Sequence, residues 1–201
     1  MSRPAALPGV ASSDRLVGVV GSASPTAPAD ILASANALGR RLAEIDVPIL
    51  TGGNAYGAVG ALTDGARSLG GTVVGVAPRS LQAGSTHQGL DRLYRVGDIP
   101  ARIAAFSDWT VQVLVLPGGL GTCEELFCLA GEVNRRSDAP ALTIVDFNQR
   151  WTPLITAISE LQSGGFISSH HRFGNHLCRT VEEVVDAVLA TQARVDARRK
   201  R

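Results

Sequence analysis

The sequence predicts a single α/β domain of the Rossmann-like class, in which helices cover both faces of a doubly wound parallel sheet. Short apolar runs alternate with helical patterns along the chain, and the runs are apolar on nearly every residue, as expected of strands buried on both faces. A chain of 201 residues with 45% hydrophobic content can bury one sizeable core. We expect this domain to span residues 15–192, between a flexible N-terminal segment, 1–14, and a basic C-terminal tail, 193–201.

Five strands are predicted, each a short apolar run. The first strand ends at Gly21-Ser22, and the second is followed by Thr51-Gly52-Gly53. The fourth strand is the most uniformly apolar and leads directly into Pro117-Gly118-Gly119. In chain order the predicted strands are residues 16–20, 48–50, 72–76, 111–116 and 142–145.

Several segments between and after these strands carry apolar residues at helical spacing, three or four positions apart. The last helix also has a start signal, because Thr180-Val181-Glu182-Glu183 is a capping box, in which hydroxyl and carboxylate each accept a backbone N–H at the helix start. The predicted apolar stripes are Ile31, Ala35, Leu38 and Leu42; Val59, Leu62, Ala66 and Leu69; Leu126, Leu129, Ala130 and Val133; Leu154, Ile155, Ile158 and Leu161; and Val184, Val188 and Leu189.

Three glycine-bearing loops follow predicted strands: Gly21-Ser22, Gly52-Gly53 and Gly118-Gly119. In doubly wound sheets, ligands bind beyond the carboxyl ends of the strands, where such loops gather. Glycine lets backbone N–H groups approach a ligand, and the N-terminus of the following helix favours an anion. A single glycine pair is more simply explained by a tight turn, but three on one rim favour phosphate binding. None has the G-x-G-x-x-G pattern or the phosphate loop that ends in Gly-Lys-Ser/Thr, which argues against dinucleotide oxidoreduction and ATP hydrolysis.

Composition and charge exclude several classes of function. A formal net charge of +1 provides no field for a nucleic-acid backbone or an acidic membrane surface. No window approaches the roughly 20 apolar residues needed to cross a bilayer. The cysteines and the late histidines lack the spacing of zinc or redox motifs, so no metal and no cofactor are predicted. The arrangement of the cysteines also favours a reducing, cytoplasmic location. These residues are Cys123, Cys128, Cys178, His170, His171 and His176.

The loop after the fourth strand runs straight into a helix that is expected to begin near Thr122. Backbone N–H groups of this loop, together with the Thr122 hydroxyl, could bind a phosphate dianion without any basic side chain. Glu125 has two interpretations. Its spacing from Thr122 is that of a capping box, but a carboxylate beside a phosphate site also suits a sugar that becomes an oxocarbenium ion. The spacing leaves both interpretations open.

This segment resembles the P-G-G-x-G-T-x-x-E signature of the LOG family, the cytokinin riboside 5′-monophosphate phosphoribohydrolases once mislabelled lysine decarboxylases. The signature is specific, and the resemblance extends over residues 16–189. It includes the first two glycine loops, the third strand and the late segment Gly164-Gly165-Phe166-Ile167. In this chain the signature reads Pro117-Gly118-Gly119-Leu120-Gly121-Thr122-Cys123-Glu124-Glu125.

The resemblance implies an enzyme that hydrolyses the N-glycosidic bond of a purine-type nucleoside 5′-monophosphate, giving free base and ribose 5-phosphate. It implies a catalytic pair: Glu125 would hold the ribose hydroxyls, stabilise positive charge near C1′ and activate water, while Arg102 would assist departure of the base. An AMP-like substrate and a homodimer are also implied. The expected substrate- and phosphate-binding residues are Gly21, Ser22, Gly52, Gly53, Gly118, Gly119, Gly121, Thr122 and Glu124.

The chain departs from the family pattern at positions that bear on the substrate. Ile103 stands where the family has lysine, Phe106 where it has methionine, and Asn54 where its second loop has a third glycine. These departures leave three alternatives open for this chain: a substrate with a different base, a substrate with a modified sugar, or a weakened activity. The sequence also leaves the pathway open.

A second hypothesis belongs to a different class of protein. The same architecture and Pro-Gly-Gly loop occur in nucleotide-sensing and molybdenum-cofactor carrier proteins, which bind a phosphorylated ligand without turning it over. The combination of Arg102 and Glu125 favours the enzyme. Pyridoxal-phosphate decarboxylation is excluded, because it requires a Schiff-base lysine and the only lysine is Lys200, in the basic tail.

Overall fold

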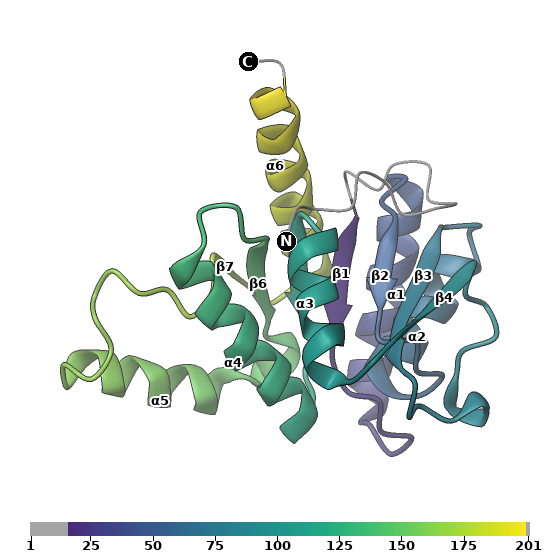
Figure 1. Ribbon diagram of the computed structural model, residues 1–201, viewed down its shortest axis with the longest axis horizontal. Helices are drawn as coiled ribbons and strands as arrows, with labels where there is room; N and C mark the ends of the chain where they lie inside the picture. Colours follow the sequence, from purple (N-terminus) through teal and green to yellow (C-terminus); the bar gives the residue numbers. More distant parts are fainter. Residues whose placement is uncertain (1–15, 200–201) are drawn as a thin grey trace.

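The computed structural model describes residues 16–199 and has an all-parallel, seven-stranded sheet. Its strands are β1 (Val17–Val20), β2 (Ile49–Thr51), β3 (Val73–Pro78), β4 (Arg92–Val96), β5 (Gln112–Val115), β6 (Ala141–Val145) and β7 (His176–Cys178). The strand order is β4-β3-β2-β1-β5-β6-β7, and Figure 1 shows β1 to β4 next to one another. The direction of winding therefore reverses between β1 and β5. This reversal confirms the predicted doubly wound, Rossmann-like class.

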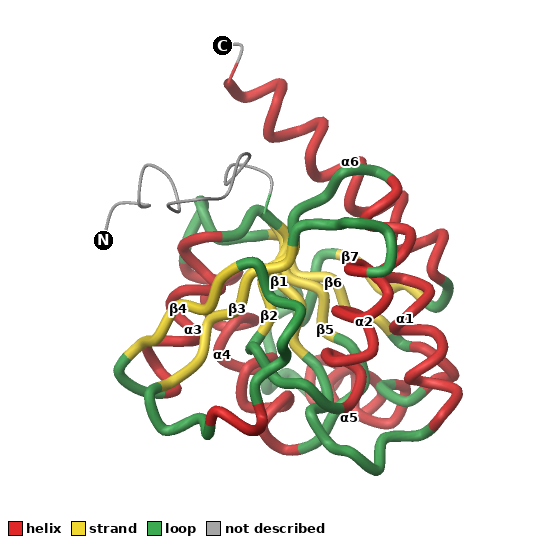
Figure 2. Tube along the Cα trace, turned by 90° about the vertical axis from the view of Figure 1, so that its right-hand side faces the viewer, coloured by secondary structure: helices red, strands yellow, loops and turns green. Residues whose placement is uncertain are grey.

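Helices cover both faces of the sheet, which lies between them in Figure 2. One face is covered by α1 (Ala29–Glu44), α2 (Gly57–Arg67) and α6 (Val181–Arg199), and the other by α3 (Ile99–Trp109), α4 (Leu120–Arg135) and α5 (Thr152–Ser163).

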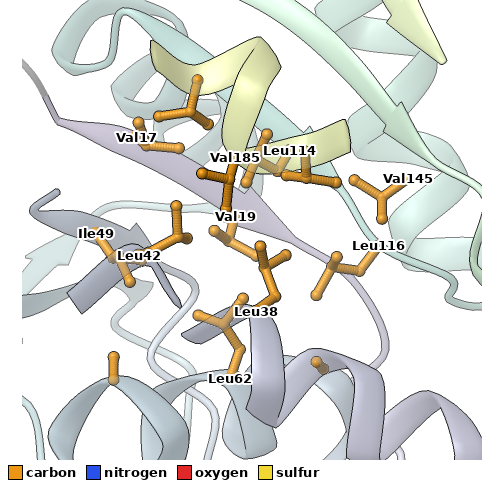
Figure 3. Close-up of a cluster of buried hydrophobic side chains, with 14 of the residues drawn as sticks. Val17, Val19, Leu38, Leu42, Ile49, Leu62, Leu114, Leu116, Val145 and Val185 are labelled. Atoms are coloured by element: carbon orange, nitrogen blue, oxygen red, sulfur yellow. The ribbon is translucent and has the colours of Figure 1, made fainter. Parts of the chain in front are cut away.

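A buried apolar cluster lies under each layer of helices. On one side, Val19 of β1 and Leu114 of β5 pack with Leu38 of α1 (Figure 3). On the other side, Val113 of β5 packs in the cluster that contains Phe106 of α3. Neighbouring residues of one strand thus enter different cores, because side chains alternate across a sheet. This is why the central strands are apolar at nearly every position.

Helices α1 and α2 touch through their backbones. A Cβ atom added to Gly39 of α1 would lie 2.0 Å from the carbonyl oxygen of Leu62, and one added to Gly65 of α2 would lie 2.0 Å from that of Asn36. The Asn36 side chain also donates a hydrogen bond to the carbonyl of Ala61, at 3.1 Å. Only glycine at positions 39 and 65 permits this approach.

The five predicted strands are present with small shifts at their ends, and two further strands, β4 and β7, were not predicted. β4 contains Arg92 and Arg95 and is partly exposed, so it lacks an apolar run. β7 has only three residues. Both strands lie at the edges of the sheet, where one side has no neighbouring strand and burial is lower, so the sequence pattern there is weak.

The chain ends differ from the prediction at one point. Helix α6 continues to Arg199 and extends beyond the sheet in Figure 1, so residues 193–199 are helical, although they were assigned to a tail. Alanine and arginine there favour helix, and neither glycine nor proline interrupts it. The predicted capping box is confirmed, since the Glu183 N–H donates to the Thr180 hydroxyl and the Thr180 N–H donates to the Glu183 carboxylate.

The predicted flexible segment, 1–14, and Lys200 lie outside the described residues. Within residues 16–199, none of the helices is both long enough and apolar enough to span a membrane.

Candidate functional site

A cavity of about 280 Å³ lies at the carboxyl edge of the sheet, where β1 meets β2 and β5. The loops around it are joined by their backbones. The Ser22 N–H donates to the carbonyl of Pro117 at 3.1 Å, and the Val59 N–H at the start of α2 donates to the carbonyl of Ser22 at 3.2 Å. The predicted site residues that line this cavity together are Gly21, Ser22, Gly52, Arg102, Gly119, Gly121, Thr122 and Glu125.

Arg102 and Glu125 form an ion pair at the wall of the cavity, from the Arg102 Nη2 to the Glu125 Oε1. The side chains are 14% and 7% exposed, so the pair is largely shielded from water. Arg102 lies in the first turns of α3, whose start is set by Asp98, because the Asp98 carboxylate accepts the Ala101 N–H at 2.8 Å. The backbone of the second loop passes close to the guanidinium, since a Cβ on Gly52 would lie in van der Waals contact with the Arg102 Nη1, at 3.4 Å.

The structure decides between the two interpretations of Glu125. Helix α4 begins at Leu120, two residues before the predicted start, and its N-cap is Gly119. In the described part of the chain, no side chain caps this helix, and the Glu125 carboxylate binds Arg102 instead of a backbone N–H. The capping-box interpretation is therefore wrong, because the helix starts too early for position 125 to reach its end.

Burial raises the pKa of Glu125 above its ordinary value. The charge of Arg102 and its hydrogen bond act in the opposite direction, and the neighbouring Glu124 adds a smaller upward contribution. Loss of water outweighs the arginine, because an ionised carboxylate loses more from desolvation than this partner returns. A buried carboxylate with a raised pKa is a stronger base than a solvated one, which suits it to accept a proton from water.

The first turn of α4 faces the cavity with Gly119, Gly121 and Thr122. No atom comes within 4 Å of a Cβ built on Gly119 or Gly121, so space is open above this turn. Helix N-termini carry a partial positive charge and exposed N–H groups, which together bind anions. The arrangement thus places an open helix N-terminus, a feature that favours anions, near the pair of Arg102 and Glu125.

Three predicted residues lie apart from this cavity. The N–H of Gly53 donates to the Thr51 hydroxyl at 3.1 Å, and a positive φ of 81° places Gly53 in a turn beside the sheet. Gly118 lines a neighbouring cavity under α1. Glu124 is exposed and lines a groove between α3 and α4. Residues that are adjacent in the sequence therefore line different cavities or grooves.

The sequence analysis did not select Asn54, Ser24 or Val59, which also line the cavity. A signal was available for Asn54, because it replaces the third glycine of the family's second loop. Ile103, in contrast, is buried in the core between α3 and the sheet and does not line the cavity. The departure at position 103 therefore does not place a side chain in the candidate site.

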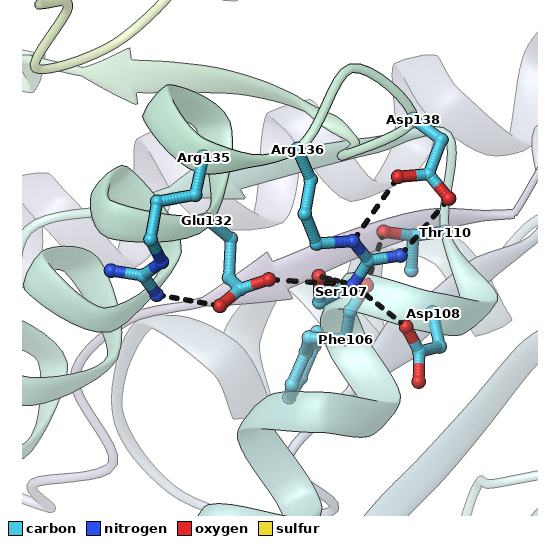
Figure 4. A network of polar contacts seen from close by, with 8 residues as sticks. All are labelled: Phe106, Ser107, Asp108, Thr110, Glu132, Arg135, Arg136 and Asp138. Atoms are coloured by element: carbon cyan, nitrogen blue, oxygen red, sulfur yellow. Dashed lines mark hydrogen bonds and ion pairs between the residues drawn. The ribbon is translucent and has the colours of Figure 1, made fainter. Parts of the chain in front are cut away.

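A second set of contacts joins the far ends of α3 and α4. Arg136, at the end of α4, forms ion pairs with Asp108 of α3 and with Glu132 and Asp138 (Figure 4). Its guanidinium also donates to the Ser107 hydroxyl at 3.2 Å. The two helices are thus held to each other at both ends, which keeps Arg102 and Glu125 in register.

Fold and site together define a Rossmann-like protein with a buried arginine–glutamate pair opposite an uncapped helix N-terminus. The family model described as "Possible lysine decarboxylase" matches residues 59–188. The chain therefore belongs to this family, the LOG family.

Similar proteins include a cytokinin riboside 5′-monophosphate phosphoribohydrolase of Rhodococcoides fascians, 31% identical over 77% of this chain and 79% of the relative. A protein of the same name from Mycobacterium marinum is 30% identical over 76% of this chain and 81% of the relative. Among solved structures, the molybdenum cofactor carrier protein of Chlamydomonas reinhardtii aligns with a TM-score of 0.69 at 21% identity, covering 89% of this chain and 98% of that chain. The last likeness supports the fold alone.

Proposed function

We propose that this protein hydrolyses the N-glycosidic bond of purine-type nucleoside 5′-monophosphates to free base and ribose 5-phosphate. The observation that carries the proposal is the buried pair of Arg102 and Glu125 opposite the N-terminus of α4. A reaction of this type needs an anion site for the 5′-phosphate and a carboxylate beside the sugar. Two relatives of 30% and 31% identity bear the name of such an enzyme.

The phosphate binds at the first turn of α4, where backbone N–H groups and the Thr122 hydroxyl donate to its oxygens. Ser22 faces the same space from the first loop. This mode of binding needs no lysine, in agreement with a sequence whose only lysine is Lys200. Fixing the phosphate there holds the ribose over the pair of Arg102 and Glu125.

Bond cleavage then follows from the charges at the pair. As the bond between C1′ and the base nitrogen breaks, its electron pair leaves with the base and C1′ gains positive charge, which the Glu125 carboxylate stabilises. Glu125 accepts a proton from the attacking water, whose oxygen bonds to C1′. Arg102 donates hydrogen bonds that stabilise the departing base, and that base takes up a proton from solvent, to which Glu125 later returns the proton that it accepted. The sum is addition of one water.

The protein acts as a homodimer in the cytoplasm. Two phenylalanines support association: Phe127 on α4 is 47% exposed, and Phe166, after α5, is 84% exposed. An interface with a second copy of the chain would bury such side chains. Light scattering of the purified protein measures the oligomer. Cys123, Cys128 and Cys178 are free thiols, which suits a reducing compartment.

The test is incubation of the purified protein with a panel of nucleoside monophosphates that includes AMP and N6-prenylated AMP. Chromatography follows free base and ribose 5-phosphate, and we expect both in equal amounts. The relative rates rank the bases, which addresses the cytokinin-type substrate named for the relatives. Binding without release of base across the panel would replace the enzyme by the carrier hypothesis.

A further inference from the structure

One end of the candidate cavity is lined by the loop after β2, on the side away from the N-terminus of α4. β1 lies between β2 and β5 in the sheet, so the loops after β2 and β5 reach the cavity from opposite sides of the first loop. Gly52 and Asn54 line one of these ends, and Gly119, Gly121 and Thr122 line the other. A nucleotide whose phosphate lies at α4 therefore extends through the cavity toward Asn54.

The Asn54 side chain is a half-buried amide that is free to bind a ligand. Its Nδ2 lies 3.6 Å from the position that a Cβ on Gly52 would take, and the Arg102 Nη1 lies 3.4 Å from the same position. The amide and the guanidinium thus flank one point on the cavity wall. Within residues 16–199 the amide has no hydrogen-bond partner. A carboxamide has an acceptor oxygen and donor hydrogens, so it can bond to a ring that carries both kinds of group side by side.

The backbone at Asn54 is held in place independently of this side chain. The Ala55 N–H donates to the Ser85 carbonyl at 2.9 Å, and Asn54 forms an isolated antiparallel bridge with Thr86. The φ angle of Asn54 lies outside the left-handed region, so the backbone requires neither glycine nor asparagine there. The family pattern has glycine at this position. Asparagine therefore adds to the cavity a polar side chain that the turn does not need.

We propose that Asn54 is a specificity residue that contacts the base and selects one whose exocyclic amino group is unsubstituted. The amide bonds to that amino group and to a neighbouring ring nitrogen, a pairing that asparagine makes with adenine. An apolar substituent on the amino group would compete for the space of the amide and leave it without a partner, which is costly in a shielded site. The chain therefore prefers AMP to N6-prenylated AMP. The inference rests on the proposed function for the direction in which the nucleotide lies.

The test compares kcat/KM for AMP and for N6-prenylated AMP in the wild type, in Asn54→Gly and in a matched control, Asn148→Gly. Asn148 lies after β6 and does not line the cavity, and its positive φ of 52° suits glycine, so the control makes the same substitution outside the site. We expect the wild type to favour AMP about tenfold, the effect of one buried polar group left without a partner. Asn54→Gly abolishes or reverses this preference, and Asn148→Gly retains it.

Asn54→Leu provides a second variant, because leucine has the branched shape of asparagine but no polar atom in its side chain. It should lower kcat/KM for AMP about tenfold, since the amino group of the base loses its partner. An unchanged value for AMP would show that the amide does not contact the base and would overturn the proposal. A wild type that favours N6-prenylated AMP would also overturn it, as would an unchanged preference in Asn54→Gly.

Failure of the proposed function is distinguishable from failure of this assignment. If AMP binds without release of base, hydrolysis is excluded for AMP, but the dissociation constants of the two nucleotides still give the same comparison across the same variants. Titration calorimetry measures them. Equal constants in the wild type, or binding of neither nucleotide, would overturn the role of Asn54.

Discussion

Helices α3 and α4 are joined by ionic contacts at both ends, and the two ends differ in kind. At their N-terminal ends, Arg102 and Glu125 form one buried pair, whereas at their C-terminal ends Arg136 joins a network that is partly open to water. Burial raises the pKa of Glu125, but hydrogen bonds from Arg135 and then from Arg136 lower the pKa of Glu132. The same types of side chain thus titrate in opposite directions.

The opposite pKa shifts indicate that the contacts of Glu132 serve stability and that the contact of Glu125 serves the chemistry. A carboxylate with a lowered pKa favours the folded state at neutral pH, because its charge is better stabilised there than in the unfolded chain. A carboxylate with a raised pKa disfavours the folded state at neutral pH, because its charge is less well stabilised there than in the unfolded chain. Glu125 is therefore retained against a thermodynamic disadvantage, as expected of a residue kept for function. Four predictions test this contrast, in order of decreasing effect.

The largest effect is expected for Glu125→Gln. Glutamine keeps the shape and can still accept a hydrogen bond from Arg102, but it neither takes a proton from water nor carries a negative charge. We expect the rate of base release to fall at least about a thousandfold, within the range known for general bases and charge stabilisation. Steady-state kinetics measure the rate, and calorimetry with AMP should give nearly unchanged affinity. A retained rate would remove Glu125 from the mechanism.

Arg102→Ala should have the largest effect on folding. It leaves a buried carboxylate without its partner, which costs about 3 kcal/mol, at the low end of the usual range because Glu125 takes up a proton instead. The free energy of unfolding in urea measures this loss. In the double variant with Glu125→Gln the charge is gone, so most of the stability should return. If the double variant is as unstable as the single one, packing and not charge explains the loss.

The dependence of stability on pH should distinguish the two ends of the helices. Because the pKa of Glu125 is raised on folding, the folded protein holds this proton at a pH where the unfolded chain has lost it. Stability should therefore fall as pH rises from the ordinary pKa of glutamate to the raised one, and activity should rise over the same interval. Unfolding curves of the wild type and Glu125→Gln measure the first effect. Parallel pH curves for both proteins would contradict a raised pKa.

Arg136→Ala should have the smallest effect. The guanidinium is 33% exposed and its partners are partly solvated, so the variant should lose about 1 kcal/mol of stability and keep the rate of base release within about twofold. Arg135→Ala is the matched control, because Arg135 is 67% exposed and pairs with Glu132 alone in the described chain. It should change stability by less than about 0.5 kcal/mol. A large loss of activity in Arg136→Ala would show that the network also positions Arg102.

The sequence predicted the interior of the fold better than its edges. Strands buried on both faces, such as β5, are apolar at nearly every position, and this leaves a clear pattern. β4 has Arg92 and Arg95 because one of its sides has no neighbouring strand, and β7 is too short for any periodicity. The apolar pattern therefore predicts strands that are fully buried and does not predict strands that are partly exposed.

For the candidate site, local spacing was not sufficient. A helix cap and a carboxylate facing the cavity both put glutamate three residues after Thr122, so only the observed start of α4 separates them. The contact with Arg102 spans 23 positions in the chain, and no local pattern encodes it. Glu124 was predicted as part of the signature and Gly53 as part of the second glycine loop, but neighbours in a turn or helix face different directions.

The backbone contact between α1 and α2 has a consequence for motion. Because Gly39 and Gly65 bring the two helices together without intervening side chains, the pair moves as one rigid body, and the hydrogen bond from Val59 to Ser22 fastens the first loop to it. The wall of the cavity that α2 and the first loop form is therefore built on a rigid pair of helices, as the wall that carries the reactive pair is built on the joined helices α3 and α4.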